Sequence, residues 1–151
     1  MEYLRFFLSS LGVFSGIIAG IIVILLSKEE QKNLQRYLKA SRALILFLAC
    51  VFLLAFLYDS NTTLFLVSLL AAFLLFLRSR IINHSVLGFF LAISSLNNNL
   101  FIIISTLFFL YWLIYAGINY NIKKKNYAVL ILNGAIFLLV ANLLSYTNLF
   151  I

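Results

Sequence analysis

The sequence contains no proline, one cysteine, one histidine and one tryptophan, and only 10% of its 151 residues are charged. The lack of proline suits long uninterrupted helices, because proline removes a backbone donor and breaks a helix interior. A single histidine cannot supply a multi-histidine metal site, and a single cysteine cannot form an intramolecular disulfide. We interpret Cys50, which lies inside an apolar run, as a small buried hydrophobic residue.

Catalytic signatures are also missing. The sequence has no Gly-x-Ser-x-Gly, no His-Glu-x-x-His, no phosphate-binding glycine loop and no cysteine pair. Only four residues are acidic, and the isolated Asp59 cannot provide a paired acid and base, so we interpret it as a turn residue. We therefore predict no catalytic residues, no metal and no cofactor. The one enzymatic alternative is a lipid-modifying enzyme that would use Glu29 and Glu30.

Hydrophobic residues, in contrast, make up 65% of the chain, and the mean hydropathy is +1.14. Soluble domains are about 45–50% apolar, so a water-soluble core is excluded. We predict an all-α polytopic bundle that forms a single membrane domain over residues 1–151, in a prokaryotic cell membrane. The N-terminus lacks a signal-peptide pattern, so the first apolar run is expected to be a mature span.

Six apolar runs predict six transmembrane helices, at residues 4–26, 43–58, 63–77, 81–96, 100–118 and 127–144. Of eleven basic residues, ten lie in the first, third and fifth connections between these runs. By the positive-inside rule those connections are cytoplasmic and both termini lie on the other side. The fourth run contains several polar residues and is alternatively interfacial or re-entrant, which would leave five spans and break this alternation.

The first connection, residues 27–42, is basic and amphipathic. Ser27 to Glu30 match a capping box, which predicts that a new helix starts at Lys28. This helix either lies on the inner leaflet before the chain turns inward at Ala43, or simply continues the second span. We expect contacts with anionic inner-leaflet lipids from the basic residues of the three cytoplasmic connections, and no nucleic-acid binding. These residues are Lys28, Lys32, Arg36, Lys39, Arg42, Arg78, Arg80, Lys123, Lys124 and Lys125.

The first run carries Gly12, Gly16 and Gly20 at four-residue spacing, which places them on one helix face. Such a face lets a second helix approach closely. It is either a seam for another chain or a packing face inside this bundle.

Polar residues also occur within the predicted spans. Ser105, Thr106, Asn133 and Asn142 are expected to face the bundle interior and hydrogen-bond to neighbouring helices. Asn133 and Asn142 are nine positions apart, about half a turn out of phase, so they do not line one pathway. We interpret His84 as an interfacial polar residue beside Arg80, in preference to a proton-handling group.

These features favour a non-catalytic membrane protein that acts through helix packing, as a homo-oligomer or a small subunit of a larger membrane complex. The alternative is a small transporter or channel for a neutral or lipid-like solute, lined by Ser, Thr and Asn. A solute pathway would require a continuous polar cavity that reaches the middle of the membrane.

Overall fold

The computed structural model describes residues 3–27, 31–60, 62–74, 80–120 and 126–146, and these residues form helices and their connections, with no strand among them. The side chains of residues 31–34, 59, 60, 74, 80 and 81 lie outside the description. The helices are α1 (Tyr3–Leu26), α2 (Gln31–Ser60), α3 (Thr62–Leu74), α4 (Arg80–Ser94), α5 (Asn98–Asn119) and α6 (Tyr127–Tyr146). The predicted all-α fold is confirmed.

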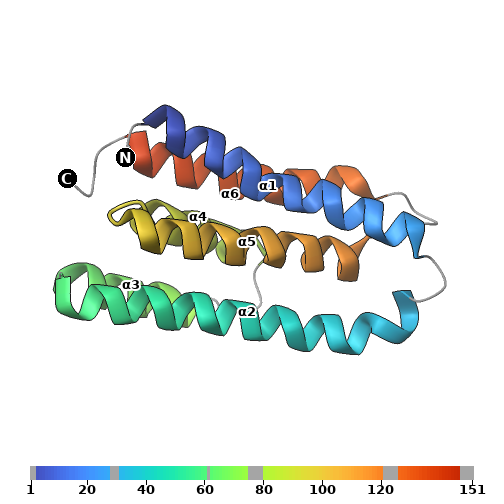
Figure 1. The fold of residues 1–151 in the computed structure, drawn as a ribbon, viewed down its shortest axis with the longest axis horizontal. Helices are drawn as coiled ribbons and strands as arrows, with labels where there is room; N and C mark the ends of the chain where they lie inside the picture. Colours follow the sequence, from blue (N-terminus) through green and yellow to red (C-terminus); the bar gives the residue numbers. More distant parts are fainter. Residues whose placement is uncertain (1–2, 28–30, 61, 75–79, 121–125, 147–151) are drawn as a thin grey trace.

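Helix α5 occupies the middle of the bundle. It packs against α1 on one side and α2 on the other, while α6 contacts both α1 and α4 (Figure 1). The start of α1 and the end of α6 lie at the same end of the bundle, where the rings of Tyr3 and Tyr146 meet edge to face at 5.7 Å. The end of α1 and the start of α2 lie at the opposite end, as do the end of α5 and the start of α6 (Figure 1).

Four of the described helices are long and apolar enough to cross a membrane: Tyr3–Leu26, Gln35–Tyr58, Asn98–Asn119 and Tyr127–Tyr146. At a rise of about 1.5 Å per residue, even a 20-residue helix covers about 30 Å, the thickness of a bilayer core. The three longest predicted runs, 4–26, 100–118 and 127–144, correspond to α1, α5 and α6, and the bounds agree within two residues.

Helices α3 and α4 are shorter, with 13 and 15 residues. Their lengths correspond to about 20 Å and 22 Å, less than the bilayer core of about 30 Å. In Figure 1, α3 runs from one end of the bundle toward its middle and α4 returns to the same end, so the two helices form a half-length pair. The described helices within the predicted runs 63–77 and 81–96 are shorter than the other four, and residues 75–79 lie outside the described residues.

The basic connection and the second apolar run belong to one helix. Helix α2 continues from Gln31 to Ser60 without a break at Ala43. Of the two arrangements that the sequence allows, the structure has the one in which the connection continues the second span. The predicted capping box falls partly on residues 28–30, which lie outside the described residues.

Glycines allow two pairs of helices to approach to backbone contact. A Cβ at Gly16 would lie 2.5 Å from the carbonyl oxygen of Phe109, and one at Gly88 would lie 2.6 Å from that of Phe137. Both distances are too short for a real methyl group. Any side chain here would therefore push α1 away from α5, or α4 away from α6.

Candidate functional site

A polar cluster is buried where α4, α5 and α6 meet. It consists of His84, Tyr115 and Asn133, which are 1%, 5% and 8% exposed. The amide Nδ2 of Asn133 donates to the hydroxyl of Tyr115 at 2.9 Å, and the same hydroxyl is 3.3 Å from Nε2 of His84. Since each helix contributes one member, we call this group the polar triad.

Aromatic rings surround the triad. The ring of His84 lies 5.0 Å from Trp112 and 5.1 Å from Tyr115, and the Tyr115 contact is edge to face. Trp112 is fully buried, and its Nε1 has no hydrogen-bond partner among the described residues. The imidazole of His84 can hydrogen-bond to Tyr115. The other space around the ring is occupied by side chains.

His84, which the sequence analysis places at the membrane interface, has a side chain that is almost completely buried in the bundle, and its depth in a membrane stays a prediction. The burial results from the packing of α4. Most of its described residues are buried, since α4 lies against α6 at the contact made by Gly88 and also touches α3 and α5. The segment that the sequence leaves most ambiguous is thus an interior helix.

The polar residues within the predicted spans behave in two ways. Asn142 lies at a helix contact, where its Nδ2 donates to Ser10 on α1 at 3.2 Å and to the Leu138 carbonyl at 2.9 Å. Ser105 and Thr106 instead donate to the carbonyl of Ile102 in their own helix, and Thr106 is exposed. The expectation that these two hydroxyls join neighbouring helices is wrong, because the preceding turn already satisfies them.

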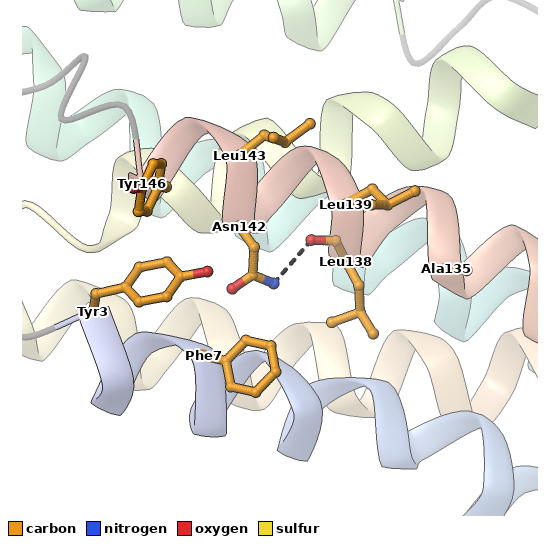
Figure 2. Close-up of a pocket in the computed structure, with 8 residues that line it drawn as sticks. All are labelled: Tyr3, Phe7, Ala135, Leu138, Leu139, Asn142, Leu143 and Tyr146. Atoms are coloured by element: carbon orange, nitrogen blue, oxygen red, sulfur yellow. Dashed lines mark hydrogen bonds between the residues drawn. The ribbon is translucent and has the colours of Figure 1, made fainter.

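Asn142 also borders a surface cavity between α1 and α6, shown in Figure 2. The cavity has a volume of about 450 Å³. Figure 2 shows the Tyr3 hydroxyl directed toward the Asn142 amide, whose Oδ1 is buried without a partner among the described residues. The other lining residues are almost all apolar or aromatic, so this cavity fits an apolar occupant better than a polar solute. They are Phe7, Ala135, Leu138, Leu139, Leu143 and Tyr146.

The glycine ladder of α1 is divided between two environments. Gly16 and Gly20 are buried against α5, where a Cβ at Gly20 would overlap the carbonyl oxygen of Leu113. Gly12 is exposed, and a Cβ there would have nothing within 4 Å. Two of the three glycines therefore form a packing face inside the chain, and only Gly12 lies on an outer surface.

Of the predicted lipid-contact residues, the three whose side chains the structure describes lie on α2. Arg36 and Lys39 are exposed, while Arg42 is half-buried. The charge of Arg42 interacts electrostatically with Tyr111 of α5. The side chains of the other predicted lipid contacts lie outside the described residues; these are Lys28, Lys32, Arg78, Arg80, Lys123, Lys124 and Lys125.

Within the described residues, no three His, Cys, Asp or Glu side chains come close enough to hold a metal ion. Glu29 and Glu30, the residues of the enzymatic alternative, lie outside that part of the chain. Comparison with protein-family models, with curated proteins and with solved structures finds no match to this sequence. Functional conclusions for this chain thus depend on its own geometry.

Sequence reasoning missed the polar triad. It identified Asn133 as intramembrane and His84 as a lone polar residue, but it did not single out Tyr115 or Trp112. Residues 84, 115 and 133 are separated by 31 and 18 positions, and only the packing of three helices brings them together. The available signal was a set of polar side chains inside apolar segments, each of which needs a buried partner.

Proposed function

We propose that this chain is a non-catalytic integral membrane protein that works as a homodimer, with two copies joined through the outer face of α1. The observation that carries the proposal is the exposed small-residue surface around Gly12. Gly12, Ser15 and Ala19 are spaced three and four residues apart, so they share one helix face. Gly12 and Ser15 are exposed and Ala19 is partly exposed. We call these three residues the outer α1 stripe.

The outer α1 stripe has the properties of a helix-pairing surface. Small side chains let two backbones come close, and association in a membrane relies on such van der Waals packing. Ser15 donates to the carbonyl of Gly12 at 2.6 Å, so its hydroxyl is already satisfied when a second helix covers it. A single stripe is also self-complementary about a two-fold axis, the commonest symmetry of protein oligomers. A second copy is therefore the simplest occupant.

Membrane insertion is supported by the four long apolar helices. In the arrangement that we propose, these helices cross the bilayer, and the half-length pair of α3 and α4 enters and returns at one side. Both chain ends then lie on the same side of the membrane, and the start of α2 lies on the other. The basic residues at the start of α2 favour the cytoplasm for that side.

The transporter alternative receives less support from the interior of the bundle. Its centre contains the fully buried rings of Trp112, Phe108 and Phe137. The cavity that borders Asn142 opens on the surface and is mainly apolar. Ser105 and Thr106, which a solute pathway would use, bond to their own helix.

The test is the mass of the protein in mild detergent, measured by light scattering with the detergent contribution subtracted. Gly12→Leu adds a bulky side chain where the chain itself has nothing within 4 Å, so the monomer fold is expected to remain intact. We expect the variant to raise the dimer dissociation constant by at least about tenfold, which corresponds to about 1.4 kcal/mol.

Ala40→Leu is the matched control, because it makes a similar enlargement at an exposed position of α2. It is expected to leave the dimer unchanged. A monomeric wild-type protein, or equal masses for the two variants, would contradict pairing through α1. The homodimer would also be overturned if the wild-type protein purified together with a different polypeptide and Gly12→Leu released that polypeptide. The chain would then be a subunit of a larger complex.

A further inference from the structure

None of the described side chains is a carboxylate, so none of them provides a negative partner for Arg42. Arg42 lies within the apolar segment Gln35–Tyr58, seven residues after its start. This distance along the helix is about 10 Å at about 1.5 Å per residue. In the membrane arrangement proposed above, a half-buried guanidinium within a spanning segment is favourable only where it pairs with an anion or extends toward the surface.

No carboxylate on the same helix can reach Arg42. The only acidic residue of α2 is Asp59, which is 17 residues away, or about 25 Å along the axis. Glu30 precedes Arg42 by twelve residues in the sequence. The chain has eleven basic and four acidic residues, so at least seven cations lack an acidic partner within it. These excess cations can therefore bind anions from another molecule.

Arg42 is also the innermost member of a basic row. Arg36, Lys39 and Arg42 follow one another at intervals of three residues, which places them on one side of α2 over about 9 Å. Arg36 and Lys39 are exposed, and Arg42 is half-buried beside Tyr111, whose side chain is 4% exposed. The row thus runs from an accessible surface to a partly enclosed end against α5.

We propose that this row binds the phosphate of an anionic lipid headgroup, with Arg42 as the principal ligand. A guanidinium presents paired N–H donors that match two phosphate oxygens, and such charge-assisted bonds are among the strongest in proteins. Lys39 and Arg36 add positive charge toward the membrane surface, where headgroups lie. The site rests on the membrane location proposed above but not on pairing through α1.

Binding is measured on the purified full-length chain in a neutral mild detergent, by titration with short-chain phosphatidylglycerol. Trp112 is the sole tryptophan, and its ring lies 5.5 Å from that of Tyr111, so its emission reports on this region. We expect saturable binding that Arg42→Gln weakens at least about tenfold, because the variant removes a charged hydrogen-bonding partner of the phosphate. Arg42→Lys keeps the charge but not the paired donors, and is expected to give a smaller loss.

Arg5→Gln is the matched control, because it removes the same charge from an exposed residue near the start of α1, at the opposite end of the bundle from the start of α2. If Arg5→Gln and Arg42→Gln lowered the affinity for phosphatidylglycerol equally, the site would be overturned, and binding would reflect general electrostatic attraction. Phosphatidylcholine is expected to bind at least several-fold more weakly, and inorganic phosphate is expected not to compete. If inorganic phosphate alone gave the same Arg42-dependent saturation, the lipid assignment would be wrong.

If Arg42→Gln lost the buried emission of Trp112 before any lipid was added, its binding result would reflect unfolding. In that case the two single variants Arg42→Lys and Lys39→Gln test the binding site. Both are expected to weaken phosphatidylglycerol binding while emission in the lipid-free protein stays unchanged. Wild-type affinity in both variants would refute the proposal.

Discussion

Substitution of Tyr115 by phenylalanine tests the polar triad most directly, because it removes one oxygen atom and leaves the ring in place. The Tyr115 hydroxyl accepts from Asn133 at 2.9 Å and lies 3.3 Å from Nε2 of His84. With the hydroxyl gone, the Asn133 amide loses the partner toward which it points. All three side chains are at least nine-tenths buried, so water cannot readily replace that partner.

Two known energies of hydrogen-bond loss bear on the expected effect of Tyr115→Phe on stability. A buried donor left without an acceptor typically lowers the free energy of unfolding by about 1–3 kcal/mol. Hydrogen bonds between membrane helices average only about 0.6 kcal/mol, with a maximum of about 1.7, because the unfolded helices also find partners in the membrane. Since this variant leaves a donor unpaired rather than removing both groups, we expect a loss of about 1–2 kcal/mol.

The assay is unfolding by increasing SDS in mixed micelles, followed through the emission of Trp112, which is fully buried in the folded chain. Asn133→Leu and the double variant complete a thermodynamic cycle. Because the double variant replaces both partners by apolar groups, it is expected to lose less stability than the sum of the single variants. Tyr37→Phe is the control, because Tyr37 is 71% exposed. Strictly additive losses, or a Tyr115→Phe protein as stable as the control, would refute the bonded triad.

Two further predictions concern helix packing and capping. Gly88→Ala is expected to lower the free energy of unfolding by about 1–3 kcal/mol, since its Cβ would meet an α6 carbonyl at 2.6 Å. Gly117→Ala, with its nearest neighbour at 3.5 Å, should be tolerated in the same SDS titration, and equal losses would contradict this packing. Asn97→Ala is expected to lower the same quantity by about 1 kcal/mol, because the Asn97 side chain accepts from the amides of Asn99 and Leu100. Asn97→Asp should keep most of that stability, and a loss as large as that of the alanine variant would show that the cap is unimportant.

The long helices could be predicted because a polar residue marks where each apolar run stops. Helix α1 ends at Leu26, immediately before Ser27, as the sequence indicates. The short helices could not be predicted in the same way, because hydropathy reports the apolarity of a run and not the length of the helix within it. The described part of α3 reaches Leu74, and residues 75–77 of the predicted run 63–77 lie outside the described residues.

Contacts between helices were harder to predict than the helices themselves. The spacing of the glycines indicates a packing face but not which helix fills it, and the structure assigns Gly16 and Gly20 to α5. The position of Gly12 on an outer surface depends on how α1 is rotated against α5 and α6. That rotation follows from the packing of the whole bundle, which hydropathy along one segment does not contain.

The alternation of basic connections is compatible with an even number of crossings. Removing two adjacent crossings leaves the first and fifth connections on their original side of the membrane. The third connection, with Arg78 and Arg80, would be cytoplasmic only in the six-span chain. The two numbers of crossings therefore differ in where they place these two arginines.

The half-length pair gives a physical reason for the position of the polar triad. The described part of α4 starts part way along the bundle rather than at its end (Figure 1). In the proposed membrane arrangement, lipid cannot satisfy polar groups at that depth, so neighbouring protein or water must. His84 lies within the first two turns of α4, and Tyr115 and Asn133 face it from α5 and α6. The short helix and the buried polar side chains are thus expected to depend on each other, and weakening the triad should loosen the start of α4 first.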